Sequence, residues 1–220
     1  SRTDIRWEPV PVSDECSEIV FTTGTTGKSK GVMLSSRCLD VYLETMNPSF
    51  RLDENSVFLL TTPLNHVGGM HRIHQCMAAG STIIIMEGVR DLKAFFRNID
   101  TYGVTHTYLP PASVKLLITL AKKELARLDG KIQFIYTASA PFPVADIETL
   151  MSLMPHTHLH QGYGSSETGS ICNCHNFSVI GMSASVKYDC INSFSLCTFS
   201  DSFADYFCRS DVAASLEFRL

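Results

Sequence analysis

Short apolar runs alternate with longer segments of helical periodicity between about Ser17 and Gly162. The short runs are rich in β-branched residues, and several are bounded by Pro or Gly, a pattern that predicts β-strands. The predicted strands are Glu18–Thr22, Val57–Thr61, Thr82–Met86, Thr105–Leu109, Ile132–Thr137 and His158–Gln161.

The segments between these strands predict helices. One begins near Asp91, a residue type that caps helix N-termini, and it carries its apolar residues on one face. The others run from about Ser36 to Met46, from after Ser113 to just before Gly130, and from about Val144 to Met154. Strands and helices that alternate at this spacing predict an α/β fold with a largely parallel sheet of βαβ units. Ligands of such sheets bind at the carboxyl ends of the strands.

The pattern divides the chain into two parts. Residues 1–170 have the strand–helix alternation and predict the core of one partial domain. Residues 171–220 contain five of the eight Cys, six of the thirteen Phe, no Pro and a single Gly, and they show neither the helical nor the strand period clearly. We therefore expect 171–220 to be an atypical tail, unrelated to the fold or poorly ordered.

The composition limits the class of protein to which this chain can belong. Hydrophobic residues make up 45% and charged residues 18%, which is typical of a globular protein. The net charge of -4 gives no reason to expect nucleic acid as a partner. No run of about eighteen apolar residues predicts a transmembrane helix, and no secretory signal is visible, so we expect a cytoplasmic protein with reduced cysteines. Nothing in the sequence indicates a protein partner.

One stretch is rich in small and phosphate-binding residue types. Between Thr22 and Gly31 lie three Gly, four Thr and two Lys, directly after the first predicted strand. Glycine lets backbone N–H groups approach an anion, threonine hydroxyls add donors, and lysine adds positive charge. The stretch therefore predicts a cradle for a triphosphate, an exposed loop that leads to the helix near Ser36.

Two kinds of phosphate loop fit this stretch. Residues 22–29 read TTGTTGKS, which is one residue away from the Walker A pattern because Thr22 stands where that pattern has its first Gly. An apolar strand that ends at Glu87 would supply the acidic residue that P-loop enzymes use for Mg²⁺. A P-loop NTPase is therefore the alternative interpretation.

The stretch also resembles the signature T-[ST]-G-T-T-G-x-P-K-G of the adenylate-forming (AMP-binding) superfamily, with Ser29 in place of Pro. Four later segments resemble that superfamily in the same order. Residues 63–69 resemble P-L-x-H-x-x-G, residues 107–113 resemble T-x-x-x-x-P-P, residues 137–142 resemble S-G-G-A-P-L, and residues 161–169 resemble Q-G-Y-G-x-T-E. In the third of these, Ala138 and Ser139 replace two glycines. A Walker A loop explains only the stretch at residues 22–29 and none of these four segments.

The resemblance implies ATP-dependent activation of a carboxylic acid as its acyl-AMP, followed by transfer to CoA, as in acyl- and aryl-CoA ligases. It implies ATP, Mg²⁺ and CoA as cofactor and co-substrates. The implied catalytic residues are Lys30, His66 and Glu167, and Glu167 with Thr26 would bind the metal. The implied nucleotide site consists of Thr22, Thr23, Gly24, Thr25, Thr26, Gly27, Lys30, Ser139, Ala140, Pro141, Gln161, Gly162, Tyr163 and Ser166. We expect the loop at Thr25 and the segment around Glu167 to share one cleft, because both follow strands of one parallel sheet.

The resemblance covers roughly Ser17 to Gly169. The superfamily's Thr-Gly-Asp segment and its C-terminal lysine have no counterpart after Gly169, and its N-terminal subdomain has none before Ser1. We therefore expect a truncated enzyme with little ligase activity by itself, and a non-catalytic remnant of an AMP-binding enzyme is a further alternative.

Overall fold

The computed structural model describes residues 11–23, 29–167, 169–176 and 186–190. The strands in these residues are β1 (Cys16–Thr23), β2 (Ser29–Ser35), β3 (Val57–Leu60), β4 (Thr82–Ile85), β5 (His106–Tyr108), β6 (Phe134–Thr137), β7 (His158–Ser165), β8 (Gly169–Asn176) and β9 (Val186–Cys190). The helices are α1 (Ser36–Phe50), α2 (Val67–Ala79), α3 (Leu92–Tyr102), α4 (Pro111–Leu120), α5 (Lys122–Ala126) and α6 (Val144–Leu153).

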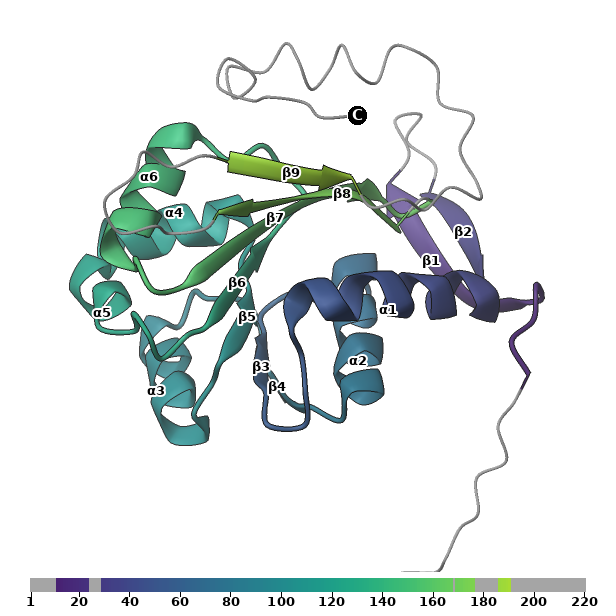
Figure 1. The fold of residues 1–220 in the computed structure, drawn as a ribbon, viewed down its shortest axis with the longest axis horizontal. Helices are drawn as coiled ribbons and strands as arrows, with labels where there is room; N and C mark the ends of the chain where they lie inside the picture. The colour runs from purple at the N-terminus through teal and green to yellow at the C-terminus, as the bar shows by residue number, and fades with distance from the viewer. Residues whose placement is uncertain (1–10, 24–28, 168, 177–185, 191–220) are drawn as a thin grey trace, which may run out of the picture.

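Seven of the described strands form one sheet in the order β4-β3-β5-β6-β7-β8-β9. The first five of these pair in parallel, and β8 and β9 are antiparallel to their neighbours. Figure 1 shows α1 and α2 on one face of the sheet and α3 to α6 on the other. The prediction of an α/β fold with a largely parallel sheet is confirmed.

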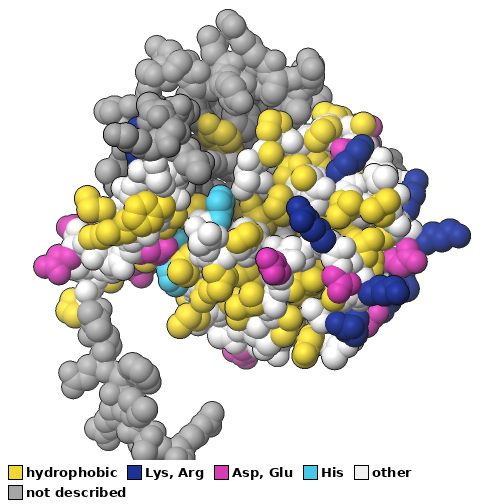
Figure 2. All heavy atoms as spheres, turned by 180° about the vertical axis from the view of Figure 1, so that it is seen from behind, with side chains coloured by type: hydrophobic (Ala, Val, Ile, Leu, Met, Phe, Trp, Pro, Cys, Tyr) yellow, Lys and Arg dark blue, Asp and Glu magenta, His cyan; other side chains and the backbone are white. Residues whose placement is uncertain are grey.

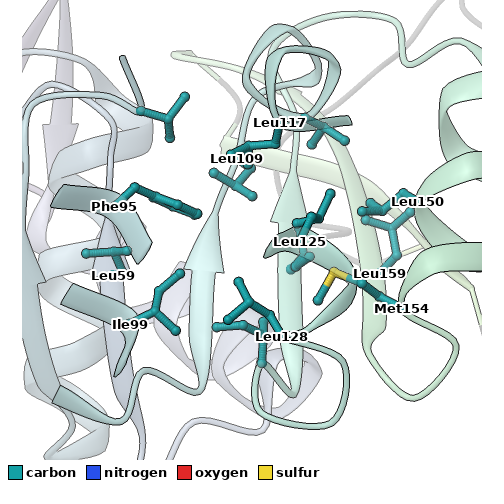
Figure 3. Packing of buried hydrophobic residues seen from close by; sticks show 14 of the residues in the cluster. Leu59, Phe95, Ile99, Leu109, Leu117, Leu125, Leu128, Leu150, Met154 and Leu159 are labelled. Atoms are coloured by element: carbon teal, nitrogen blue, oxygen red, sulfur yellow. The ribbon is translucent and has the colours of Figure 1, made fainter. Parts of the chain in front are cut away.

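Both faces of the central strands are buried. On β3, Leu59 points to the side of α3 to α6, whereas Phe58 and Leu60 pack on the side of α1 and α2. This alternation is the period-two pattern of a strand between two helical layers. The larger cluster, part of which Figure 3 shows, joins α3, α4, α5 and α6 to the sheet through side chains such as Phe95 and Leu117.

The predicted helix ends are set by local chemistry. Asp91 accepts a hydrogen bond from the backbone N–H of Ala94 at 2.9 Å, so it caps α3 as expected. The same helix ends at Gly103, whose φ of 64° is the left-handed conformation that favours glycine. The predicted helix from after Ser113 is divided in two, because α4 ends at Leu120 and a short α5 follows. Helix α2 was not predicted.

The first predicted strand does not join the parallel sheet. Strand β1 pairs with β2 in an antiparallel hairpin of its own, and Thr22 lies opposite Lys30 in its register. The stretch after Thr23 therefore leads into a second strand before α1 begins, and the expected direct passage from loop to helix is wrong. The argument that the loops at Thr25 and Glu167 follow strands of one sheet fails with it.

The last predicted strand is longer than expected. Strand β7 continues from His158 through Ser165, so Gly162 to Ser165 lie within the strand and not in a loop after it. Strands β8 and β9 then extend the sheet through residues that the sequence pattern placed in the atypical tail. No described helix is long and apolar enough to cross a membrane.

The surface differs between the two ends of the molecule. Figure 2 shows Lys and Arg side chains gathered at the end formed by α3 to α6, whereas apolar side chains are spread over this face, including the end of the hairpin. Three of the exposed apolar side chains, Ile19, Phe21 and Met33, belong to that hairpin.

The core of α3 offers a test of the fold. Phe95 is 1% exposed and Tyr102, on the same helix, is 52% exposed. We expect Phe95→Ala to lower the free energy of unfolding by about 3–5 kcal/mol, because it removes a buried ring and leaves a cavity. Tyr102→Ala is the matched control and should change it by no more than about 0.5 kcal/mol. Urea denaturation followed by circular dichroism measures both, and equal effects of the two variants would contradict this packing.

Candidate functional site

A cavity of about 230 Å³ lies at the carboxyl edge of the parallel strands. Its lining comes from segments far apart in the sequence: His66, Val67 and Gly68 after β3, His71 and Arg72 in α2, Tyr108 in β5, Tyr136, Ala138 and Ser139 at the end of β6, and residues 163–166 from β7 and its turn. Tyr42 of α1, Gly169 and Ser170 complete it. The cavity therefore lies where ligands of a parallel sheet are expected.

The segment after β3 turns sharply into α2. His66 caps that helix, because its ring Nδ1 accepts a hydrogen bond from the backbone N–H of Gly68 at 3.0 Å. Gly69 passes so close to the preceding turn that an added Cβ would lie 2.3 Å from the carbonyl oxygen of Pro63. A side chain at this position would push α2 away, so glycine is needed to hold His66 at the cavity.

The segment after β6 carries an unusual backbone conformation. Ser139 has a φ of 76°, in the left-handed region that a residue other than glycine rarely adopts. Its hydroxyl lies 2.8 Å from the hydroxyl of Tyr108, which pairs with Tyr136 across β5 and β6. This hydrogen bond holds the side chain that replaces glycine against the wall of the cavity.

The end of β7 also needs glycine. An added Cβ at Gly164 would lie 1.9 Å from the carbonyl oxygen of Gly169, because β7 and β8 approach closely at a bulge. The turn between these strands carries Ser166, which lines the cavity, and Glu167, which is exposed. The close pairing of the two strands thus fixes where Ser166 lies.

The wall formed by α1 and α2 is aromatic and contains one buried cation. Arg72 is 2% exposed, and its Cζ lies 4.8 Å from the ring centroids of both Phe50 and Tyr136. Its Nη2 donates a hydrogen bond to the hydroxyl of Tyr42. Burial raises the pKa of Tyr42 and of Tyr136, so both hydroxyls stay protonated and neutral at ordinary pH.

The profile of AMP-binding enzymes matches residues 3–191 of the chain. The chain belongs to the AMP-binding enzyme family. Its match to that family extends through β9, beyond the part in which the sequence motifs were found.

Individual members of the AMP-binding family are moderately similar to it. The 4-coumarate–CoA ligase 5 of Oryza sativa subsp. japonica is 31% identical over 169 residues, covering 74% of this chain and 31% of that protein. Acyl-CoA synthetase 7 of Caenorhabditis elegans is 31% identical over 177 residues, covering 72% of this chain and 31% of that protein. The chain thus spans less than a third of the length of either relative.

Solved structures of adenylate-forming enzymes share the fold. The N-terminal subdomain of Klebsiella oxytoca NpsA, in complex with 3-hydroxybenzoyl-AMSN, superposes with a TM-score of 0.68 at 20% identity. The match covers 84% of this chain and 47% of that one. At this identity the similarity concerns the fold alone.

The cavity brings together some of the residues that the AMP-binding motifs implicate. His66, Ser139, Tyr163 and Ser166 line it. Other implicated residues are described but do not line it: Thr22, Lys30, Ala140, Pro141, Gln161, Gly162 and Glu167. The side chain of Thr23 and residues Gly24, Thr25, Thr26 and Gly27 lie outside what the structure describes. In the described part of the chain, no group of three His, Cys, Asp or Glu residues is placed to hold a metal ion.

Sequence reasoning missed the aromatic and basic lining. Tyr108 and Tyr136 lie side by side near the carboxyl ends of two parallel strands, so aligning the ends of the predicted strands would have found them. His71 and Arg72 belong to α2, whose helical pattern was not recognised because Gly68 and Gly69 interrupt its start. Tyr42 lies on a predicted helix, but only the tertiary structure brings it to the cavity.

The conformation of Ser139 leads to a prediction about stability. Both Ser139→Gly and Ser139→Ala remove the hydroxyl, but only glycine relieves the positive φ. We expect the glycine variant to be more stable than the alanine variant by about 1 kcal/mol. At Glu148, an exposed position within α6, we expect the opposite order. There the alanine variant should be more stable than the glycine variant by a similar amount, since glycine disfavours a helix. Chemical denaturation of the four variants checks this. An alanine variant that is more stable than the glycine variant at position 139 would contradict it.

Buried His71 predicts a pH dependence of stability. Burial, and then the nearby charge of Arg72, lower the pKa of His71 to about 3, from about 6.5 in an unfolded chain. Between these values the unfolded state binds a proton that the native state does not, so stability falls as the pH falls. We expect wild type to lose up to about 1.4 kcal/mol per pH unit more than His71→Gln in this range. Urea denaturation between pH 7 and pH 4 measures the difference, and parallel curves would refute it.

Proposed function

We propose that the protein activates a carboxylic acid with ATP and then transfers the acyl group to CoA. In the first step a carboxylate oxygen attacks the α-phosphorus of ATP, and the bond to pyrophosphate breaks. In the second step the CoA thiolate attacks the acyl carbon, and AMP leaves. The observation that carries this proposal is the meeting of three motif segments, represented by His66, Ser139 and Ser166, in one cavity. Membership of the AMP-binding family and the similarity to CoA ligases support it.

The cavity wall suits an acid next to a nucleotide. Because Nδ1 of His66 accepts the hydrogen bond from Gly68, a neutral ring carries its proton on Nε2, which is able to donate to a carboxylate oxygen. Tyr163 offers an aromatic face for adenine, and Ser166 offers a hydroxyl for the α-phosphate. We assign His66 to the acid and the residues from β7 to the nucleotide.

Magnesium would be held mainly through the phosphates. Glu167 is an exposed carboxylate in the turn after β7, two residues beyond the end of the strand. One carboxylate together with phosphate oxygens and water is a common donor set for Mg²⁺, so this turn fits the ion. The bound ion would neutralise charge on the phosphates during the first step.

The hairpin favours this proposal over a P-loop NTPase. A P-loop passes from a strand directly to the N-terminus of a helix, whose N–H groups bind the phosphates. Here Ser29 begins β2, and α1 starts only after that strand ends. Lys30 lies on β2 as an exposed side chain, and we assign its charge to the phosphates of ATP.

Lys30 provides the test of the first step. In an intact parent enzyme that contains this sequence, we expect Lys30→Ala to slow acid-dependent exchange between ATP and labelled pyrophosphate by about 10²–10³-fold, because a positive charge that stabilises the transition state is lost. The apparent affinity for the acid should change much less. Lys93→Ala, which removes another exposed lysine on α3, is the control and should exchange as wild type does.

The same assay separates the alternatives. A panel of fatty and aromatic acids, with CoA added in a second series, tests both steps. Exchange that is unchanged in Lys30→Ala would reject the role of this lysine. ATP hydrolysis that does not depend on any acid would favour an NTPase. No exchange with any acid, in protein that still binds ATP, would indicate a non-catalytic member of the family.

A further inference from the structure

Arg72 is a buried cation without a charged partner in the described part of the chain. Its side chain lies in the cavity wall at 2% exposure, between α1 and the end of β6. Of its guanidinium nitrogens, Nη2 donates to Tyr42, but Nε and Nη1 are buried and have no hydrogen-bond partner among the described residues. No described Asp or Glu forms an ion pair with Arg72 or lines the cavity.

The neighbours of Arg72 do not neutralise its charge. An arginine stays protonated even when buried, so its positive charge persists. His71 is neutral at ordinary pH because burial lowers its pKa to about 3, and the pKa of Tyr42 and of Tyr108 is raised by burial. The rings of Phe50 and Tyr136 attract the cation, but they leave the unpaired N–H groups unsatisfied. Proteins rarely bury a charge in this way unless an anion joins it.

We propose that Arg72 binds a second anionic group of the acid substrate, so that the preferred substrate is a dicarboxylic acid or an acid with a similar oxyanion. This inference rests on the proposed function. Oxyanions accept strong, charge-assisted hydrogen bonds from guanidinium groups. The acid's reacting carboxylate would lie toward the nucleotide, and its other anionic end would reach Arg72.

The location of Arg72 favours the acid over ATP as the source of this anion. Arg72 lies on α2, the helix that His66 caps, and His66 is the residue that we assign to the acid. The residues that we assign to the nucleotide, Tyr163 and Ser166, come from the sheet side of the cavity, in β7 and the turn after it. A phosphate of ATP remains the competing ligand, and the two are separated by experiment.

Matched acids test the proposal without any mutation. Straight-chain dicarboxylic acids of increasing length are compared with monocarboxylic acids of equal length, by calorimetric binding to the protein and by pyrophosphate exchange. We expect the best dicarboxylic acid to bind at least about tenfold more tightly than its monocarboxylic counterpart, the gain expected for a hydrogen bond to a charged group. Equal binding of the two would overturn the proposal.

Variants of Arg72 test its part in this preference. Arg72→Met keeps a long apolar stem and removes the charge, so the preference for the dicarboxylic acid should be lost, whereas Arg72→Lys should keep part of it. Arg97→Met, at an exposed position of α3, is the control and should retain the full preference. A preference that survives in folded Arg72→Met would overturn the proposal.

The outcome distinguishes this inference from the proposed function. If Arg72→Met weakens the binding of ATP as strongly as that of the dicarboxylic acid, the anion belongs to the nucleotide and the inference fails. If exchange proceeds equally with both classes of acid, the proposed function stands and the inference fails. If no acid supports exchange, the proposed function fails, and the binding preference alone decides the role of Arg72.

Discussion

The parallel register of the central strands determines where the candidate site lies. Leu60, Tyr108, Tyr136 and His160 are paired in sequence across β3, β5, β6 and β7, so their side chains form one row on the face covered by α1 and α2. Because parallel strands end at a common edge, each following segment begins beside this row. His66, Ser139 and Ser166 meet at the cavity for that reason, although 100 residues separate the first of them from the last.

The packing of Phe50 fixes the position of α1 relative to this row of side chains. Its ring lies 4.6 Å from that of Tyr136 and 5.1 Å from that of His160, and its carbonyl oxygen lies 3.1 Å from Nε2 of buried His106. These contacts fix the last turn of α1 on the sheet. Since a helix is a rigid rod over this length, they also fix Tyr42, two turns earlier, where it accepts the hydrogen bond from Arg72.

The sequence predicted the periodic parts of the fold better than the rest. Buried strands such as Val57–Leu60 have apolar runs between clear turn signals, and α3 has both a cap and an apolar face, so local physics specified them. The hairpin partner β2 was missed because Ser29–Ser35 is mostly exposed and its apolar run is only three residues long, Val32 to Leu34. Its strand conformation depends on pairing with β1, and a local pattern does not report such pairing.

The site residues that the motifs identified are set by local backbone requirements, whereas the site residues that sequence reasoning missed are set by tertiary contacts. The loop and turn residues of the motifs are small because the backbone must pass close to other atoms. This requirement is visible in the local sequence as glycine, as at Gly69 and Gly164. No local sequence pattern identifies Arg72, since its environment is made by Phe50 from α1 and Tyr136 from β6. An exposed lysine such as Lys30 is solvated before any ligand arrives, whereas a cation within aromatic walls has already lost its water. The buried charge therefore discriminates more sharply between ligands with and without an anion than the exposed one does.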